Sequence, residues 1–524
     1  MFMFLKEKVL PTYFLFLLIF IPLFPKLPIL DVSYTWTYVR IEDFLVVLAY
    51  VLLGVLLFAR KAQIKSFLFW PILIFWGVGL LSTIIAFPGL ENGDNYVTYK
   101  PTLVVLHYLR RIEYLGMFFI GFVALQNHIQ FKRILVALGV TLFLVSLYGI
   151  GQQYLSFPAF LTMNEEFAKG IPLPLQSGAR VSSTFGGHYD LAGYLVLAMP
   201  IFVAMLFGQF RIKLKIFLGV ILFLGFYVMI LTSSRISFVA LLVSLWLLLF
   251  ALSTHKKIIM SVFGLLITVV LILGRETILD RFVKTIRIRQ VDYDPAISRV
   301  LEPPTRTKDW GGLPESDTAL LIPFTPVEYT SSAYKVFKYK KSDYEAIKEL
   351  NPDSDVTTVE LPQVLTNEEI AGAPEEIIEE YRKVEGNFEK RWALVFDISL
   401  TTRVQGGWPV AWKAFLSNPL TGRGYSTVTA AVDSSYMRAL GEVGIVGFVS
   451  FFAILIIFMN RAWGYIKGVE GGLGRLYLMG LSAGIVGLLI NALLIDIFEA
   501  SKVAFVLWML IGVGAALITK RVNV

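Results

Sequence analysis

The chain has 524 residues, of which 56% are hydrophobic and 16% are charged, and none is cysteine. A soluble protein has about a quarter of its residues charged, so this composition excludes a single soluble domain and a disordered chain. The lack of cysteine excludes disulfides, thiol catalysis and metal sites built on cysteine. The net charge of +8 does not predict nucleic-acid binding, because Lys and Arg in a membrane protein first mark its topology.

Apolar residues occur in blocks of roughly 18–25, which is long enough to cross a bilayer as helices. We therefore predict an all-α integral membrane protein with about twelve transmembrane helices. The first block has no obvious small-residue cleavage site, so we interpret it as a retained helix rather than a signal peptide. The expected spans are 11–30, 43–59, 67–88, 101–126, 133–152, 189–208, 213–232, 235–253, 257–274, 436–460, 474–496 and 502–519.

Basic residues between the expected spans predict their orientation. If the N-terminus is cytoplasmic, the segments on that side carry seventeen Lys and Arg residues and only two acidic residues, Glu7 and Glu470. Each of these segments is basic, as the positive-inside rule requires. The sequence thus predicts an even number of spans, with both termini in the cytoplasm and the long polar stretch outside.

That polar stretch divides the chain into three regions. Residues 1–274 form a nine-span membrane region, residues 275–435 a large external loop element, and residues 436–524 a three-span membrane region. The middle region is too polar to cross the membrane and too long for a plain connector. We expect a mobile insert over about 290–390, with some strands near Val336 and Phe337.

Two helix-like runs are expected in the external element, from 375 to 383 and from 408 to 416. The second run carries Trp408, Trp412 and Phe415 at spacings of four and three. Such an aromatic stripe is more typical of packing or of an interfacial anchor than of a sugar-binding platform.

Arg110 and Arg111 lie inside a long apolar segment, with Glu113 three residues after Arg110. A charge at that depth normally faces a partner or a wet cavity. Glu113 lies on the same helical face as Arg110. Two interpretations stand side by side: substrate binding by the two arginines, or a structural ion pair that locks neighbouring helices.

Further polar residues lie where chain segments meet the expected outer face. Arg235 sits in the short turn between the seventh and eighth spans, behind two serines that can cap the next helix. The start of a helix stabilises an anionic oxygen, so Arg235 is a candidate for anion binding. The alternative is that Arg235 is an interfacial arginine that extends its charge to the membrane surface. Arg180 and His188 flank a glycine-containing stretch before the sixth span, and His188 is a candidate proton carrier or a capping residue.

Arg403 and the pair Asp433 and Tyr436 complete the candidate residues before the tenth span. An acid at the mouth of a membrane cavity can act as a general base. For Asp433 the alternative is a helix N-cap, a position that Ser434 can fill equally well. The four histidines have no metal-ligand spacing, so a metal site built on histidine is not expected.

Four segments together resemble the O-antigen ligase and O-antigen polymerase family, and the resemblance covers most of the membrane part from about residue 100 onward. The order of the motifs and the largest external loop between spans nine and ten also match. The segments are RVSSTFGGHYDLAGYLVLAMP at 180–200, LTSSRISFVALLVSLWLLL at 231–249, the run from Arg403 through WPVAWKAFLSNPLTGRGYS, and DSSYMRALGEVGIVGF at 433–448.

The resemblance implies an activity, a fold and a location. The activity is transfer of an oligosaccharide or polysaccharide from a polyprenyl diphosphate-linked donor to a glycan, lipid or protein acceptor, in the assembly of surface polysaccharides. The fold is a GT-C-like helical bundle in the lipid bilayer of the cytoplasmic (inner) membrane, with the active site on the outer face. No metal or other cofactor is implied.

The same resemblance implies roles for the candidate residues. Arg235 is the first candidate to hold the diphosphate, followed by Arg180 and Arg403, because guanidinium groups bind phosphate oxygens bidentately. Ligases of this family usually carry a histidine before the span that follows the large loop, and this chain has Asp433 there. Asp433 is therefore the expected base or acceptor-orienting group, a pattern closer to the polymerase branch.

A transporter or flippase for a lipid-linked or anionic substrate is the alternative function. Twelve spans and intramembrane charges fit that class as well. The two halves of the chain show no clear hydropathy symmetry, whereas many transporters contain internal repeats. A scaffold or sensor is a third class, and it predicts that the candidate arginines can be replaced without loss of activity.

Overall fold

The computed structural model describes two units of the chain. One comprises Met1–Leu273 and Gly407–Val524, and the other comprises Gly274–Gly406. The residues that the structure describes are 1–31, 38–87, 101–162, 165–176, 178–253, 264, 286–294, 299–301, 319–320, 328–338, 363–365, 381–396, 403, 407–428, 432–469 and 471–520.

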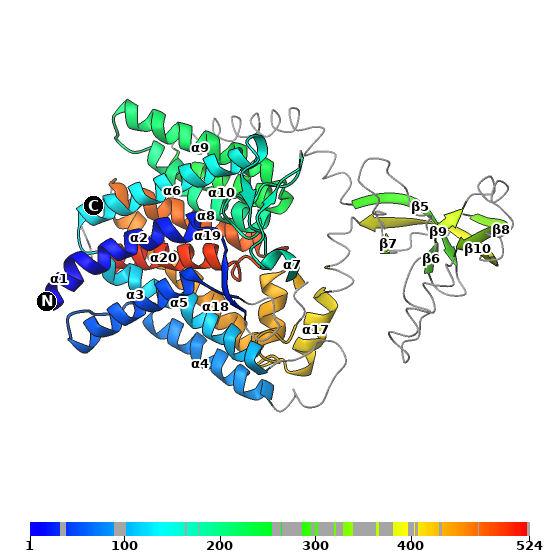
Figure 1. The fold of residues 1–524 in the computed structure, drawn as a ribbon, viewed down its shortest axis with the longest axis horizontal. Helices are drawn as coiled ribbons and strands as arrows, with labels where there is room; N and C mark the ends of the chain where they lie inside the picture. Colours follow the sequence, from blue (N-terminus) through cyan, green and yellow to red (C-terminus); the bar gives the residue numbers. More distant parts are fainter. Residues whose placement is uncertain are drawn as a thin grey trace. The chain divides into compact units, whose positions relative to one another are not determined.

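The first unit is helical (Figure 1). Two short antiparallel hairpins accompany its helices, β1 (Pro28–Asp31) with β2 (Tyr38–Arg40) and β3 (Pro158–Ala159) with β4 (Leu173–Pro174). The helices are α1 (Phe2–Phe4), the π-helix η1 (Leu5–Val9), α2 (Leu10–Leu23), α3 (Ile41–Phe58), α4 (Phe69–Ala86), α5 (Pro101–Ala124), α6 (His128–Tyr154), α7 (Glu165–Ala168), α8 (His188–Leu206), α9 (Ile212–Thr232), α10 (Arg235–Leu252), α17 (Trp408–Ser417), α18 (Ser435–Gly468), α19 (Leu473–Asn491) and α20 (Ser501–Lys520).

Within the described residues, nine helices are long and apolar enough to cross a membrane, so the chain is an integral multi-pass membrane protein. Large apolar side chains that would be unfavourable in water cover the outside of these helices: Phe58 is 94% exposed and Phe223 is 71% exposed. Hydrocarbon is the natural solvent for such a surface. The nine are α3, α4, α6, α8, α9, α10, α18, α19 and α20.

Three expected spans need comment. The first was predicted to reach residue 30, and that boundary is wrong: α2 ends at Leu23, because Phe24 precedes a proline and adopts an extended conformation. The span expected at 101–126 corresponds to α5, which carries the two arginines. The span expected at 257–274 lies outside the described residues, except for residue 264.

Helix α20 forms the centre of the helical unit, and all its residues from Ser501 to Leu517 are buried. Two glycines let it contact the backbone of α5 directly. A Cβ atom on Gly121 would lie 2.4 Å from the carbonyl oxygen of Met509, and one on Gly512 would lie 2.2 Å from that of Phe118. Small residues allow this close approach, which is common between membrane helices.

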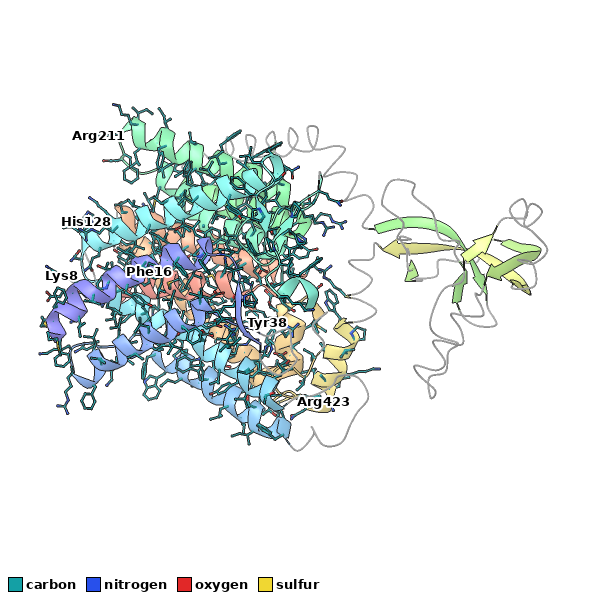
Figure 2. The ribbon with its side chains drawn as sticks, in the orientation of Figure 1. Lys8, Phe16, Tyr38, His128, Arg211 and Arg423 are labelled. Atoms are coloured by element: carbon teal, nitrogen blue, oxygen red, sulfur yellow. The ribbon has the colours of Figure 1, made fainter. Side chains whose placement is uncertain are left out.

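The start of α1 and the end of α20 lie at the same end of the helical unit (Figure 1). Lys8, His128 and Arg211 also lie at this end, and Arg423 lies toward the opposite end (Figure 2). The ammonium group of Lys520 donates to the carbonyl oxygens of Phe122 and Leu125 there, at 2.7 and 2.9 Å. This arrangement agrees with the charge pattern, and which end faces the cytoplasm stays a prediction.

The second unit is a six-stranded antiparallel sheet with the order β6-β5-β10-β8-β9, in which β7 also pairs with β10. The strands expected near Val336 and Phe337 are confirmed, because both residues belong to β8. The strands are β5 (Ile286–Asp294), β6 (Arg299–Leu301), β7 (Ala319–Leu320), β8 (Glu328–Lys338), β9 (Gln363–Leu365) and β10 (Tyr381–Phe396).

The prediction of a helix over 375–383 is wrong for the described residues of that run, 381–383. The run 375–383 ends in a strand, because β10 begins at Tyr381 and pairs with β8 from Tyr381 opposite Lys338 onward. Backbone pairing with a neighbouring strand outweighs the local preference of charged residues for helix. The expected insert 290–390 contains the strands from β6 to β9 with parts of β5 and β10, and its other residues lie outside the described part. The helix expected at 408–416 is confirmed as α17, in the first unit.

Candidate functional site

Helices α8, α10 and α18 all start beside the end of α19 and the segment 492–500, which joins α19 to α20. Ser435 at the start of α18 donates its N–H to the carbonyl oxygen of Ala492, at 3.1 Å. Ser237 in the first turn of α10 donates to the amide oxygen of Asn491, at 3.0 Å. A Cβ atom on Gly193, near the start of α8, would lie 2.1 Å from Ile497. The fold thus brings three segments that are distant in sequence to one end of the helical unit.

We call the residues that lead into these three helices the helix-start region: 180–188, 233–235 and 433–436. Each part contains one residue other than glycine with a left-handed backbone, namely Ser183 (φ 51°), Ser233 (φ 54°) and Asp433 (φ 47°). Side chains with a Cβ atom adopt this conformation rarely, and such backbone strain clusters at functional sites. The sequence patterns singled out the same three parts.

Arg180 and His188 contact each other in the first part. The guanidinium Nη1 of Arg180 lies 3.2 Å from Nε2 of His188. Arg180 is exposed, whereas His188 is only 4% exposed. The N–H of Val181 donates to the carbonyl oxygen of Leu231 at 3.2 Å, which joins this loop to the end of α9 and hence to the turn before Arg235.

Hydrogen bonds fix the loop between Arg180 and His188 on several sides. The N–H of Ser183 donates to the side chain of Gln152 at 2.6 Å, and its hydroxyl donates to the carbonyl oxygen of Val145 at 2.7 Å. The N–H of Thr162 donates to the carbonyl oxygen of Gly186 at 2.8 Å. A Cβ atom on Gly186 would lie 2.2 Å from the hydroxyl of Thr162, so glycine is needed here for close approach. The loop is therefore held in one conformation before any ligand binds.

Two buried lysines that the sequence analysis missed support the same loop. The ammonium of Lys502 donates to the carbonyl oxygens of Phe24 (2.5 Å), Thr184 (2.7 Å) and Pro22 (3.2 Å). Lys26 pairs with Asp190 at 3.3 Å. Burial lowers the pKa of Lys26, and the nearby Asp190 carboxylate opposes that shift. Isolated lysines next to apolar blocks were the sequence signal that could have indicated these residues.

Arg235 is the first residue of α10 and is partly exposed. Ser234 occupies the N-cap position as expected, but its side chain makes no capping hydrogen bond to the helix. Its hydroxyl lies 2.7 Å from the hydroxyl of Ser237 instead, which in turn reaches Asn491. The serines therefore connect the start of α10 to α19.

At the start of α18 the structure separates the two interpretations of Asp433. Ser434 is the N-cap, and its hydroxyl accepts the N–H of Met437 at 3.4 Å. Asp433 is not the cap, and it is partly exposed one residue earlier. The hydroxyl of Tyr436 donates to the carbonyl oxygen of Leu489 at 2.8 Å, and its ring stacks on Phe452 at 4.9 Å between centroids. These contacts give Tyr436 a packing role.

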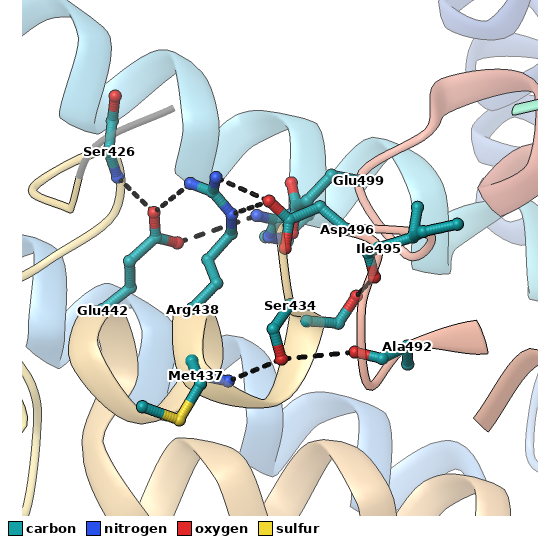
Figure 3. Close-up of polar contacts among 11 residues, drawn as sticks. Ser426, Ser434, Met437, Arg438, Glu442, Ala492, Ile495, Asp496 and Glu499 are labelled. Atoms are coloured by element: carbon teal, nitrogen blue, oxygen red, sulfur yellow. Dashed lines mark hydrogen bonds and ion pairs between the residues drawn. The ribbon is translucent and has the colours of Figure 1, made fainter. Parts of the chain in front are cut away.

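Five charged side chains cluster at the first turns of α18. We call this cluster the α18 network: Arg111, Arg438, Glu442, Asp496 and Glu499. Figure 3 shows the guanidinium of Arg438 between Asp496, at 2.7 Å, and Glu442, at 3.2 Å. Arg111 pairs with Glu499, and its second carboxylate neighbour is Glu442, at 3.8 Å. Glu442 also accepts the N–H of Ser426 at 3.0 Å.

All residues of the α18 network except Asp496 line a cavity of about 40 Å³, together with Tyr425 and Trp508. This volume holds a few waters and no sugar. Burial raises the pKa of Tyr425, so its hydroxyl stays neutral, and Arg111 lies over its ring, 5.3 Å from the centroid. The lining of this cavity leaves out Arg180, Arg235 and Asp433.

Arg110 and Arg111 both have carboxylate partners. Arg110 binds Asp43 at 2.5 and 3.0 Å, and the expected pair with Glu113 is confirmed at 3.2 Å. It also donates to the carbonyl oxygen of Tyr38 at 3.3 Å. These contacts favour the second interpretation drawn from the sequence, a structural ion pair between helices.

Arg403 belongs to the second unit, where it is 5% exposed. The aromatic stripe of α17 is a packing feature in part, since Trp408 packs on a small cluster around Ala411 and Val428. Trp412 on the same helix is 46% exposed. Among the described residues, no group of three or more His, Cys, Asp or Glu side chains is placed to hold a metal ion.

Arg438, Asp496 and Glu499 of the α18 network are not among the candidate residues predicted from the sequence. Each lies at the end of an apolar block, where a charge is easily taken for an ordinary boundary residue. Arg438 and Asp496 are 58 positions apart, so no local pattern predicts their contact.

No protein-family model and no curated protein matches the chain. The resemblance to the O-antigen ligase and polymerase family therefore rests on the four sequence segments, their order and the predicted position of the large loop. Three of those segments contain the parts of the helix-start region, and the geometry of that region is the basis for the functional proposal.

Proposed function

We propose that the protein is a membrane glycosyltransferase. It moves an oligosaccharide or polysaccharide from a polyprenyl diphosphate carrier to an acceptor at the outer face of the cytoplasmic membrane. The observation that carries the proposal is the convergence of the starts of α8, α10 and α18 on Asn491, at the end of α19, and on the segment 492–500 that follows it. This convergence supports a shared site for Arg180, Arg235 and Asp433.

The arginines suit the leaving group of this reaction. Negative charge develops on the diphosphate as the glycosidic bond breaks, and a fixed cation in a poorly solvated place stabilises that charge more than water does. Arg235 at the start of α10 adds its charge to the partial positive charge of the helix N-terminus. Arg180 provides a second guanidinium, oriented by His188. A role for Arg403 in the same step remains a prediction from the sequence.

Asp433 suits the acceptor. The bond to the sugar forms from an acceptor hydroxyl, whose proton must be accepted or directed by a nearby group. Ser434, and not Asp433, is the N-cap of α18, and the Asp433 side chain is partly exposed. Tyr436, Arg110 and Arg111 become positioning residues in this proposal, since their contacts support α18 and α5 rather than a ligand.

The experiment uses the full chain in lipid nanodiscs with a fluorescent undecaprenyl diphosphate-linked oligosaccharide and an unlabelled copy as acceptor. The wild-type protein should extend the glycan and release undecaprenyl diphosphate. Arg235→Ala should lower turnover by about 10²–10³-fold, the effect of losing one fixed donor. Arg235→Lys should recover part of the activity, because it restores the charge without the bidentate geometry.

Arg211→Ala is the matched control. Arg211 is the N-cap of α9 and lies at the end with the termini (Figure 2), so its removal should leave turnover unchanged. Full activity of Arg235→Ala would remove Arg235 from the mechanism. If the wild type shows no turnover but moves the lipid-linked donor across the membrane of sealed vesicles, the flippase alternative replaces the transferase. EDTA should have no effect on the transferase.

A further inference from the structure

The first helical turns of the chain have an unusual shape with an identifiable cause. Residues Leu5–Val9 form a π-helix, in which the N–H of Leu10 donates to the carbonyl oxygen of Leu5. The next residue is Pro11, which has no N–H and so cannot bond to the preceding turn. The helix is widened at this point, as π-helical turns are, and such turns are frequent at functional sites.

The widened turn is held from outside the helix. The side-chain amide of Gln126 donates to the carbonyl oxygen of Lys6 at 2.6 Å, which replaces the bond that Pro11 cannot make. Gln126 in turn donates its N–H to the side chain of Gln130, at 2.8 Å. Both glutamines belong to the junction of α5 and α6, so the wide turn is a fixed part of the fold.

A cavity of about 210 Å³ lies between this turn and the start of α6. It is about five times the volume of the cavity at the α18 network, about 40 Å³. Lys8 and Arg133 line it together with a single acid, Glu7. The apolar side chains of Phe14, Leu15 and Ile134 also line it. Two cations against one carboxylate leave a net positive charge beside an apolar wall.

The position of the cavity fits a bilayer surface. Lys8 lies at the end of the helical unit where α1 starts and α20 ends (Figure 2), and α6 runs from there into the bundle as a candidate span. Helix ends mark the depth at which lipid head groups lie. Basic pockets between membrane helices attract anionic head groups, and arginine binds phosphate oxygens with its planar fork.

We propose that this cavity binds an anionic phospholipid of the surrounding bilayer. Lys8 and Arg133 hold the phosphate group, and the acyl chains lie toward Phe14, Leu15 and Ile134. The apolar wall distinguishes a lipid from dissolved phosphate, which offers nothing to cover it. The site is independent of the proposed transferase chemistry, which involves the opposite end of the unit.

The test measures lipid binding to the full chain by native mass spectrometry in a mild detergent, with phosphatidylglycerol against phosphatidylcholine. At low ionic strength the wild type should bind phosphatidylglycerol about thirtyfold more tightly than phosphatidylcholine. This preference corresponds to the attraction of two cations near the membrane surface for an anionic lipid. The double variant K8Q/R133Q should lose this preference. The control K213Q/K215Q removes the exposed Lys213 and the partly exposed Lys215 at the start of α9, and it should keep the preference.

A second variant leaves every charge in place. Thr12 lines the cavity and is exposed, so T12W should fill the space and also abolish the preference. Equal binding of the two lipids by the wild type, or a preference that survives in K8Q/R133Q or T12W, overturns the proposal. Displacement of phosphatidylglycerol by millimolar inorganic phosphate would assign the site to dissolved phosphate and overturn the lipid assignment.

Discussion

The α18 network and the helix-start region are neighbours, but they hold their charges differently. In the network, the side chains of Glu442 and Arg438 are 3% and 11% exposed and bind each other. In the helix-start region Arg180 is exposed, and Arg235 and Asp433 are partly exposed. A buried ion pair has fixed partners, and loss of one leaves a costly charge behind. The side chains of the helix-start region have exposed surface that a ligand can contact. Substitutions in the α18 network should therefore mainly lower stability, and substitutions in the helix-start region should mainly lower activity.

The largest expected effect is on activity, from Asp433→Asn. Asparagine keeps the left-handed backbone of Asp433 but cannot accept a proton. Turnover should fall by about 10²–10⁴-fold, the usual contribution of a general base, while the unfolding temperature stays near that of the wild type. The assay is the transfer reaction in nanodiscs, paired with a thermal unfolding scan. Wild-type turnover in this variant would exclude Asp433 as the base.

The second effect is on stability, from Arg438→Met. This change removes the cation that binds the buried Glu442 and the partly buried Asp496, and breaking a buried ion pair costs about 3–5 kcal/mol. The unfolding temperature in nanodiscs should drop clearly. The double variant with Asp496→Asn should recover part of the loss, because one of the two stranded charges is then gone.

Arg461→Met is the matched control for Arg438→Met, since Arg461 is exposed on the same helix. Its effect should be much smaller. Equal effects of the two changes would show that the network does not stabilise α18, and the contrast between the two regions would then fail.

Lys502→Met tests a buried residue that holds part of the helix-start region in place. Its ammonium binds three carbonyl oxygens, one of them in the loop before His188. Hydrogen bonds to a charged group contribute about 1.5–3 kcal/mol, so stability should fall by that order. The KM for the lipid-linked donor should rise as the loop loosens. A stability loss with an unchanged KM would show that the loop does not contact the donor.

Ser434→Ala gives the smallest expected effect and a sharp comparison with its neighbour. Loss of the N-cap of α18 should cost about 1 kcal/mol, and turnover should change little. The two adjacent residues would then affect different properties: Asp433 would affect turnover, and Ser434 would affect the stability of α18. A large drop in turnover with intact stability would move the acceptor site to Ser434.

Much of the helical unit could be predicted from the sequence. Hydropathy is summed over consecutive residues, so the spans that became α8, α9 and α10 are visible without any tertiary information. The first span was placed too long because the stop at Phe24 depends on the following proline. The strand at Tyr381 was missed because its pairing partner Lys338 lies far away in the chain.

For the candidate site, the polar residues that precede the starts of α8, α10 and α18 could be identified from the sequence, because turns and helix starts are set by neighbouring residues. Three features depend on the packing of distant segments: these starts meet at Asn491 and the segment 492–500, Ser434 rather than Asp433 caps α18, and Arg111 pairs with Glu499. The physical reason is that a buried charge is stabilised by whichever opposite charge the fold brings near it. Distance along the chain has no part in that choice.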